Sequence, residues 1–366
     1  MREVYAGVMS GTSLDGVDAV IGDFAPATGG PCALIAAAHL PFPSALRDEV
    51  LALQSAGGDE LARAARAANA LADVYADAIA GALVRAGLTS SDIVAAGVHG
   101  QTVRHAPDEG WTLQLNNPAR VAERAAMTVV ADFRSRDVAA GGQGAPLVPA
   151  FHAALFGGSG HRVVVNLGGI ANLTDLPGQG DIRGFDIGPG NVLLDLWHAR
   201  HREGWFDTDG GWARTGKIDE PLLAAFFTEP FFARTPPKST GRDLFHRDWL
   251  DQKLVGRDRA PADVQATLVA LTVRTVRDAI ATHCAAATDV LVCGGGAKNP
   301  TLMEALVDAL APRTVATTAA HGVAVDHVEA LAFAWLAREA LAGRSGNLPG
   351  VTGARGRRVL GAIYPR

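Results

Sequence analysis

The stretch VYAGVMSGTSLDGVDAVIGDF, residues Val4–Phe24, decides the fold. Its two apolar runs, Val4–Met9 and Val17–Phe24, flank a turn of Gly, Ser, Thr and Asp, which is typical of a β-hairpin. A similar layout recurs at Val163–Leu176, VVVNLGGIANLTDL, where two apolar runs flank Asn and two glycines. Because these strand-turn-strand segments precede helical patterns, we predict two related α/β halves.

Length, composition and charge favour two domains and a small-molecule partner. The chain has 366 residues, 48% of them hydrophobic, which exceeds what one core usually holds and favours two domains around a cleft. The formal net charge of -5 gives no electrostatic case for binding nucleic acid or an anionic membrane. Three widely spaced cysteines without metal-ligand spacing fit a reducing compartment. With no basic segment before an apolar run at the N-terminus, the expected location is the cytoplasm.

No membrane-spanning segment is expected. The Ala-rich stretch Leu61–Ala82 carries Arg63, Arg66, Asp73 and Asp77 at helical spacing, as an amphipathic helix of a soluble protein does. Periodicity predicts helices over Ser44–Ala56, Glu60–Ala86, Ala262–Cys284 and Val328–Ala342 and strands over Ile93–Gly100, Asp289–Cys293 and Arg358–Ile363. We expect the last of these strands to pair with an existing sheet.

Glycine turns at strand ends are the recurring chemical theme. They lie at Ser10–Gly16, Gly168–Gly169, Gly188–Asn191 and Gly294–Gly296. Backbone N–H groups in such turns can point at phosphate oxygens without a Cβ in the way. None of the four has the spacing of a P-loop or of a dinucleotide fingerprint, which disfavours both common nucleotide folds. A plain tight turn is the alternative for any one of them.

Phosphoryl transfer also needs acids, for which Asp15, Asp18 and Asp186 are candidates. Asp186 has the most specific sequence context of the three, because FDIGPGN places it after an apolar run and before a Gly-Pro-Gly turn that fixes an irregular backbone. Its alternative role is that of a helix N-cap or turn acid.

Other polar residues are candidates for substrate binding, each with a structural alternative. His99 and Gln101 end a buried strand and could contact sugar hydroxyls, although a buried His is often structural. Arg134 and Arg136 lie in an irregular, donor-rich stretch that could hold a carboxylate, and a surface ion-pair cluster with Asp137 competes with that role. Glu329 begins an apolar helix, where the helix dipole alone explains an acid.

Seven motifs together carry a family resemblance. GVMSGTSLDGVD, HGQT, DFRSRDVAAGGQGAPLVP, VNLGGIANLT, GFDIGPGN, CGGGAKNP and VEALAFAWLA follow one another over nearly the whole chain. In this order they resemble the anhydro-N-acetylmuramic acid kinase family. The sequence departs from the pattern at Ile187, where some relatives are expected to have a small polar residue such as Thr. A backbone role at that position would survive the change.

The resemblance implies an α/β fold of the two-domain actin-like ATPase type, with duplicated ribonuclease H-like domains, an interdomain cleft, ATP and Mg²⁺ as cofactors and closure on substrate. We expect an N-terminal domain over residues 1–133, joined by a C-terminal strand within residues 350–366, and a second domain over residues 134–349. The expected partner is the sugar 1,6-anhydro-N-acetylmuramic acid, without nucleic acid or membrane. A homodimer is left open.

Carried onto this sequence, the resemblance makes Asp186 the catalytic acid-base residue. The residues expected around the nucleotide are Gly11, Thr12, Ser13, Leu14, Asp15, Gly16, Val17, Asp18, Gly168, Gly169, Gly294, Gly295 and Gly296. The substrate-binding candidates are His99, Gln101, Arg134, Arg136 and Glu329, and no metal ligands are assigned.

The implied reaction couples hydrolysis of the anhydro bridge to phosphorylation of O6 during cell-wall recycling. A simple N-acetylhexosamine or polyol kinase of the same fold is one alternative. A non-catalytic nucleotide switch of the Hsp70-like type is another. A serine hydrolase using Ser10 or Ser13 is disfavoured, because the sequence around them lacks the GxSxG elbow.

Overall fold

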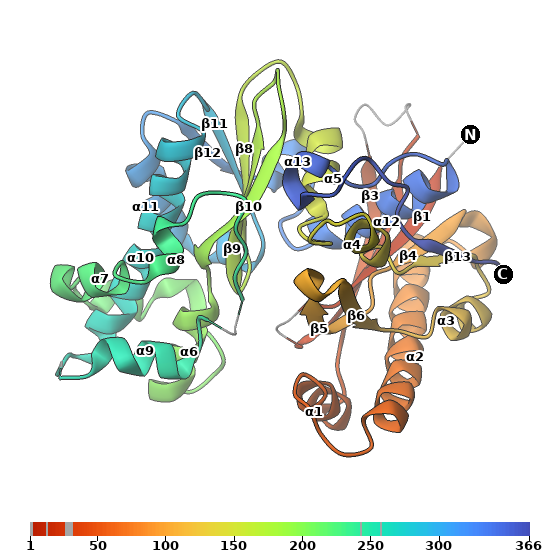
Figure 1. Ribbon diagram of the computed structural model, residues 1–366, viewed down its shortest axis with the longest axis horizontal. Helices are drawn as coiled ribbons and strands as arrows, with labels where there is room; N and C mark the ends of the chain where they lie inside the picture. Colours follow the sequence, from red (N-terminus) through yellow and green to blue (C-terminus); the bar gives the residue numbers. More distant parts are fainter. Residues whose placement is uncertain (1–2, 12–13, 26–31, 242–243, 257) are drawn as a thin grey trace. The chain divides into compact units, whose positions relative to one another are not determined.

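The computed structural model describes residues 3–11, 14–25, 32–241, 244–256 and 258–366. It divides into two compact units: unit 1, Met1–Leu155 with His327–Arg366, and unit 2, Phe156–Asp326 (Figure 1). The divisions therefore fall after Leu155 and after Asp326, whereas the sequence placed them after residues 133 and 349. The second boundary differs because the helix that follows His327 packs on the sheet of unit 1.

Unit 1 is built on a six-stranded mixed sheet in the order β13-β7-β4-β1-β2-β3. The strands are β1 Val4–Met9, β2 Gly16–Asp23, β3 Ala33–Pro41, β4 Ala95–Val98, β7 Val129–Ala131 and β13 Ala362–Tyr364. β1, β2 and β3 are antiparallel to one another, and β4 and β7 continue the sheet in parallel from β1. The predicted opening hairpin is thus confirmed. The C-terminal strand pairs with β7 as expected, but it begins at Ala362 and is shorter than predicted.

Glycines bring one helix close to this sheet. Helix α12, Val328–Leu341, packs on β1 and β4. A Cβ on Gly7 would lie 1.9 Å from the carbonyl oxygen of Ala330, and one on Gly97 would lie 1.9 Å from that of Phe333. No side chain fits at either position, so the backbone of α12 rests directly on the two strands.

Helix α2, Glu60–Ala86, packs against β2 and β3. It is the one helix among the described residues that is long and apolar enough to cross a membrane by length and composition, and half of its most apolar window is buried inside unit 1. Its charged residues form ion pairs with other elements of the unit, as Arg63 does with Glu49 and Asp73 with Arg120. These contacts belong to a packed helix of a folded domain.

The remaining elements of unit 1 surround the sheet. They are the helices α1 Ser44–Ala52, α3 Pro118–Ala125, α4 Ser135–Ala139, α5 Val148–Phe156 and α13 Pro349–Thr352 and the separate hairpin of β5 Gln101–Ala106 and β6 Trp111–Leu115. A buried carboxylate ties two of these segments together. Asp137 in α4 accepts hydrogen bonds from the Gly144 N–H (2.8 Å), Asn347 Nδ2 (2.6 Å) and Thr352 Oγ1 (2.8 Å). The glycine-rich stretch after α4 is thereby fixed to the C-terminal segment.

Unit 2 repeats the architecture of unit 1. Its sheet has the order β10-β9-β8-β11-β12 and consists of β8 Arg162–Leu167, β9 Ile170–Leu176, β10 Arg183–Pro189, β11 Asp289–Cys293 and β12 Thr314–Thr317. β8, β9 and β10 are antiparallel neighbours, and β11 and β12 follow in parallel. This is the order and direction of β3-β2-β1-β4-β7 in unit 1. Because it is also the strand order of a ribonuclease H-like domain, the predicted duplicated α/β fold is confirmed.

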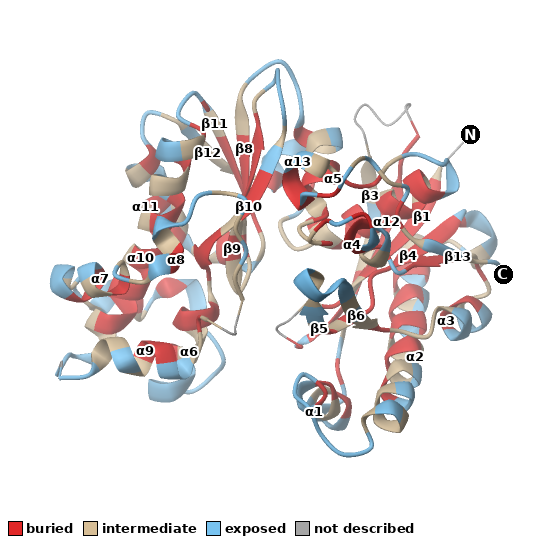
Figure 2. Cartoon of the chain, viewed as in Figure 1, coloured by how far each residue is buried: buried red, intermediate tan, exposed pale blue. Residues whose placement is uncertain are grey.

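The helices of unit 2 supply most of its core. They are α6 Val192–His201, α7 Glu220–Phe226, α8 Pro230–Ala233, α9 Arg247–Leu254, α10 Pro261–His283 and α11 Pro300–Leu310. The strands β8 and β11 are buried over most of their length (Figure 2). Aromatic side chains from α8, α9 and the loop between them pack together in the same core: Phe231, Phe245 and Trp249.

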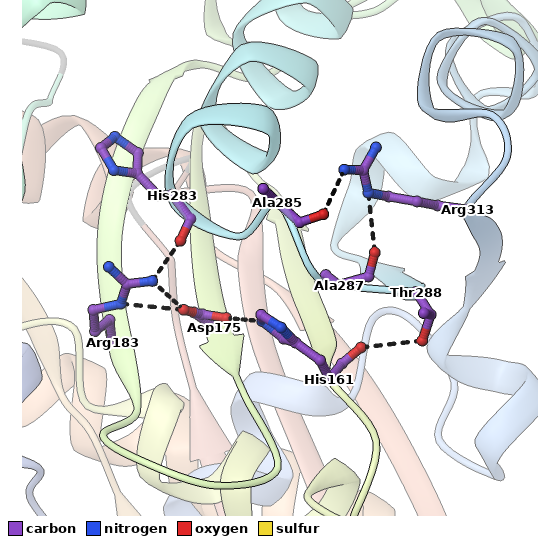
Figure 3. A network of polar contacts seen from close by, with 8 residues as sticks. All are labelled: His161, Asp175, Arg183, His283, Ala285, Ala287, Thr288 and Arg313. Atoms are coloured by element: carbon purple, nitrogen blue, oxygen red, sulfur yellow. Dashed lines mark hydrogen bonds and ion pairs between the residues drawn. The ribbon is translucent and has the colours of Figure 1, made fainter.

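A polar network joins the strand ends of unit 2 that lie away from the glycine turns (Figure 3). Asp175 in β9 is 1% exposed and binds both His161 Nε2 (2.6 Å) and Arg183 Nη2 (2.6 Å). The carbonyl of His161 accepts from the Thr288 N–H (3.1 Å), and Arg313 binds the carbonyl of Ala287 through Nε (3.1 Å). The network links β8, β9 and β10 to the loop before β11 and has a structural role.

Candidate active site

Two of the predicted glycine turns meet at the end of β8 in unit 2. The N–H of Gly190 donates to the carbonyl of Gly169 (2.9 Å), and the N–H of Asn191 donates to that of Gly168 (2.8 Å). The side chain of Asn191 adds a bond from Nδ2 to the carbonyl of Leu167 (2.9 Å). The turn after β8 and the turn after β10 therefore form one hydrogen-bonded backbone unit.

The third turn packs against the same strand end. Gly294, after β11, has φ +81°, and a Cβ on it would lie 2.3 Å from Oδ1 of Asn166. A Cβ on Gly296 would lie 2.6 Å from Cβ of Leu167. Gly294 is thus required by both packing and backbone conformation, and Gly296 by packing. The three glycine turns together are named the glycine cradle below.

Other glycines of the cradle are less crowded. The nearest atoms to a Cβ on Gly168, Gly169 and Gly295 would lie at 3.4, 3.9 and 3.8 Å, which are ordinary contact distances. Their backbone can be approached closely by a ligand. Helix α6 begins at Val192 directly after the cradle and adds the positive end of its dipole. This set of donors fits the phosphate chain of a nucleotide.

Asp186 lies in β10, close to the cradle in the chain. The ladder between β10 and β9 shifts register between Asp186 and Gly188, which is a β-bulge. Ile187, in the bulge, is 2% exposed and belongs to the core of unit 2, so the departure from the family pattern is accommodated by packing. The alternative of a helix N-cap is wrong, because Asn191 occupies the cap of α6.

The surroundings of Asp186 raise the pKa of its carboxyl group to about 6. Burial is the main cause, and the N–H of Thr240 and the charge of Lys238 oppose it. The N–H of Thr240 donates to Oδ2 at 3.0 Å, and no described residue donates to Oδ1. A carboxylate with one oxygen held, the other open and a pKa near neutrality is suited to accept a proton.

The N-terminal turn lies in unit 1. Thr12 and Ser13, two of the predicted nucleotide-binding residues, lie outside the described residues. The side chains of Leu14 and Val17 are 1% and 0% exposed and pack in the core, so only their backbone is available to a ligand. Gly11 accepts a hydrogen bond from the N–H of Leu14 (3.3 Å), which closes the turn.

Two acids flank the end of this turn. Oδ1 of Asp15 accepts from the N–H of Gly16 (3.1 Å). Oδ1 of Asp18 is paired with Nδ1 of His39 on β3 (2.9 Å). Burial raises the pKa of Asp18, and the hydrogen bond and charge of His39 lower it. Gly16 is needed beside this pair, because a Cβ would lie 2.7 Å from the His39 ring.

His99, Arg134 and Glu329 form a second polar group in unit 1. Nε of Arg134 donates to Nε2 of His99 (2.9 Å), and its Nη1 donates to the carbonyl of Gly144 (2.7 Å). Because Nε2 is an acceptor, the proton of a neutral His99 ring is on Nδ1. Burial, followed by the charge of Arg134, holds the pKa of His99 well below its usual value. Burial also raises the pKa of Glu329, against the attraction of Arg134.

The other two substrate candidates of unit 1 differ sharply. Gln101 is 0% exposed, and its Nε2 donates to the carbonyl of Gly11 (3.3 Å), which ties it to the N-terminal turn. Its Oε1 has no hydrogen-bond partner among the described residues, as an atom that meets a ligand hydroxyl would. Arg136 is exposed in α4, whereas Arg134, two residues earlier, is partly buried beside His99.

Comparison with known proteins identifies the family. The model of the anhydro-N-acetylmuramic acid kinase family matches residues 3–366. The chain belongs to this family. An anhydro-N-acetylmuramic acid kinase of Burkholderia thailandensis is 55% identical over 99% of this chain and 98% of its own length. One of Cupriavidus pinatubonensis is also 55% identical, with the same coverage.

Solved structures that the chain resembles are more distant. A ROK family glucokinase from Streptomyces griseus is 14% identical, with a TM-score of 0.42, and the alignment covers 92% of this chain and 99% of that one. The activator of the 2-hydroxyisocaproyl-CoA dehydratase from Clostridium difficile is 11% identical, with a TM-score of 0.45 and coverage of 91% and 93%.

In this anhydro-N-acetylmuramic acid kinase family member, two residues beside Asp186 were not predicted from the sequence. Lys238 and Thr240 contact Asp186 through space from a loop that was treated only as a polar mid-region. The available signal was the polar run Lys238–Gly241, which directly follows Pro236 and Pro237. Nothing in its spacing indicates which strand it meets.

In the part of the chain that the structure describes, no three His, Cys, Asp or Glu side chains gather into a metal site. Magnesium in kinases takes only one or two carboxylates besides phosphate oxygens and water. Asp15 and Asp18 are carboxylates of the kind that could face a Mg²⁺ ion carried by nucleotide phosphates.

Proposed function

We propose that this kinase hydrolytically opens the 1,6-anhydro ring of 1,6-anhydro-N-acetylmuramic acid and phosphorylates O6. The products are N-acetylmuramic acid 6-phosphate and ADP, formed in peptidoglycan recycling. The observation that carries the proposal is the carboxylate of Asp186, held through Oδ2 by Thr240 and open at Oδ1, on the strand that leads into the glycine cradle. Membership in the family supplies the substrate class.

In the first step Asp186 acts as the base. One O–H bond of water breaks and its proton passes to Oδ1 of Asp186, while the water oxygen bonds to C1 of the sugar. The C1–O6 bond breaks and its electron pair remains on O6. Because the pKa of Asp186 is raised to about 6, the carboxylate is both ionised at neutral pH and basic enough to take part of the proton in the transition state.

In the second step O6 forms a bond to the γ-phosphorus as the bond from that phosphorus to the ADP oxygen breaks. ATP supplies the phosphoryl group, and Mg²⁺ offsets the charge on its phosphate oxygens. We assign the phosphate contacts to the backbone around Gly168, Gly169 and Gly295, where close approach is sterically open. Asp15 and Asp18 are the carboxylates proposed to face the metal ion.

We assign sugar recognition to the polar group of unit 1. Gln101 Oε1 is buried without a partner among the described residues and can accept from a sugar hydroxyl. Arg134 is the donor proposed for the lactyl carboxylate, because its guanidinium is fixed by His99 and Gly144. Arg136 was the other candidate and is exposed, so we do not assign it.

We propose a cytoplasmic location from the state of the cysteines. Cys32 and Cys284 are free thiols, which supports a reducing compartment such as the cytoplasm. Homodimer formation stays a prediction, which size-exclusion chromatography with light scattering would test.

The decisive experiment uses ¹⁸O-water. The protein is incubated with Mg-ATP and 1,6-anhydro-N-acetylmuramic acid, and the product is analysed by mass spectrometry for label at the anomeric oxygen. We expect one ¹⁸O at C1 and one phosphate on O6 for each ADP formed. Phosphorylated sugar without label would instead identify a simple sugar kinase. ATP hydrolysis that the sugar does not stimulate would identify a nucleotide switch.

A further inference from the structure

The segment Lys238–Thr240 lies along the outer edge of β10, which is the last strand of the sheet of unit 2. The N–H of Asp186 donates to the carbonyl of Lys238 (3.1 Å), and the N–H of Thr240 donates to Oδ2 of Asp186 (3.0 Å). The same short segment therefore fixes both the backbone and the side chain of Asp186. It occupies the edge position that a further strand would otherwise take.

The ammonium group of Lys238 is fixed as well. Its Nζ lies 3.4 Å from the carbonyl oxygen of Phe231 and 3.5 Å from that of Phe232, to which it donates. It also lies 4.7 Å from the centroid of the Phe231 ring. Phe231 is 1% exposed and packs edge-on against Phe245. A lysine is usually mobile, whereas this charge is anchored to a rigid aromatic cluster.

The position of this charge relative to Asp186 is unusual for a lysine. The two side chains form no ion pair among the described residues, yet each influences the other. Burial raises the pKa of Asp186, and the N–H of Thr240 and then the charge of Lys238 lower it. Burial and then the charge of Arg234 lower the pKa of Lys238, and Asp186 raises it, while Lys238 in turn lowers the pKa of the nearby His283. A cation that acts without direct contact stabilises a carboxylate and leaves its free oxygen available.

We propose that Lys238 is a positioning residue for Asp186: its anchored ammonium keeps the carboxylate charged, and its loop turns Oδ1 toward the water to be activated. The proposal rests on the proposed function, in which Asp186 is the base. When Asp186 takes the proton from water, the ammonium disfavours its retention, so the proton is released to solvent before the next turnover. Lys238 itself touches no reacting atom.

A structural role of Lys238 and an electrostatic role predict different pH dependences of the rate when the lysine is replaced. Loss of packing lowers the rate by the same factor at every pH. Loss of the anchored charge raises the pKa of Asp186 and moves the acid limb of the pH profile toward higher pH. The direction of this shift is therefore the property to measure.

The test compares Lys238→Met, which keeps the length of the side chain without the charge, with Lys238→Arg, which keeps the charge. Lys253→Met is the matched control, because Lys253 also lies over an aromatic ring of unit 2 (5.5 Å from Trp249) and donates to Thr228 (2.7 Å). For each variant kcat/KM is measured from about pH 5 to about pH 9 with Mg-ATP and the anhydro sugar. Circular dichroism confirms folding, and Lys238→Gln replaces Lys238→Met if that variant does not fold.

We expect Lys238→Met to move the acid limb upward by about one pH unit, which lowers kcat/KM about fivefold near pH 6 and changes it about twofold or less near pH 8. Lys238→Arg restores the wild-type limb, and Lys253→Met leaves it unchanged. An unchanged limb in Lys238→Met, or a loss equal at every pH, overturns the proposal. If Asp186→Asn keeps normal turnover, the proposed function itself fails, and the two failures are thus distinguishable.

Discussion

The main-chain N–H of Thr240 lies 3.0 Å from Oδ2 of Asp186 and holds that oxygen in place. Thr240 and Asp186 are far apart in the chain and meet because the loop before α9 returns along β10. The carboxylate therefore presents a single free oxygen in a fixed direction. Such preorganisation is what separates a catalytic base from an ordinary strand carboxylate.

The first prediction concerns the chemical step. Asp186→Asn should lower kcat by about 10²- to 10⁴-fold, because the amide cannot take a proton, while the Kd for ATP changes about threefold or less. In the wild type, kcat/KM should fall below about pH 6 as the carboxylate is protonated. Steady-state kinetics and calorimetric titration with ATP measure both effects. Near-normal turnover of Asp186→Asn would remove Asp186 from the role of base.

The second prediction concerns stability, which Asp186→Asn should increase although it lowers activity. The pKa of Asp186 is raised in the folded protein from 3.8 to about 6, so its contribution to stability is full below about pH 4 and is lost as pH rises through about 6. Asp186→Asn should therefore be more stable than the wild type at about pH 8, by about 1 to 3 kcal/mol, and this advantage should shrink near pH 4. Urea unfolding at the two pH values measures it. A difference that does not change with pH would contradict the burial effect.

The third prediction tests the glycine cradle. Gly294→Ala should weaken ATP binding and destabilise unit 2, because the new Cβ would lie 2.3 Å from Oδ1 of Asn166. Gly322→Ala is the matched control: its φ of +82° equals that of Gly294 to within a degree, and a Cβ there meets nothing within 4 Å. Both variants carry the backbone strain, so only the difference between them reports on the cradle. Equal ATP affinities in calorimetry would show that the crowding does not reach the phosphate site.

The fourth prediction separates two arginines. Arg134→Met should raise the KM for the anhydro sugar at least about tenfold, since a charge-assisted bond to a carboxylate is lost, whereas the KM for ATP changes little. Arg136→Met serves as control, because Arg136 is exposed and should leave both constants close to wild type. An unchanged sugar KM in Arg134→Met would exclude the lactyl contact. Folding is checked by thermal melting, because Arg134 also supports His99 and Gly144.

The fifth prediction concerns the buried carboxylate of α4. Asp137→Ala should destabilise unit 1 by about 3 to 5 kcal/mol, because three donors lose their acceptor in a site that is 0% exposed. Arg136→Ala, on the exposed side of the same helix, should change the free energy of unfolding by about 0.5 kcal/mol or less. Chemical denaturation of both variants compares them. A small effect of Asp137→Ala would mean that water replaces the lost acceptor.

Much of the fold could be predicted from the sequence where local pattern and tertiary packing agree. The strand Val4–Met9 and the helix Glu60–Ala86 were predicted with their observed bounds, because an apolar run or a helical period ends there at a turn. The strand β10 was not, since Gly188 and Pro189 are poor strand residues and enter the ladder only through a bulge. The local sequence pattern does not show that pairing with β9 would hold these residues in a strand.

The candidate site shows the same division. The glycines of the cradle could be located from their spacing, because each follows an apolar strand. The roles of Lys238 and Thr240 could not, since both contact Asp186 only after the chain has folded back on itself. Arg134 and Arg136 were equivalent in sequence and became different only when one of them met His99.

The packing of α12 against Gly7 and Gly97 has a consequence for folding during synthesis. Unit 2 is a continuous stretch of chain, whereas unit 1 is completed only by residues after Asp326. On the ribosome, unit 2 can fold as soon as it emerges, while β1 and β4 wait with one face bare for a helix that is translated among the last residues. The nascent first half therefore exposes an apolar sheet face until α12 is made, and a truncation before Val328 would leave that face uncovered.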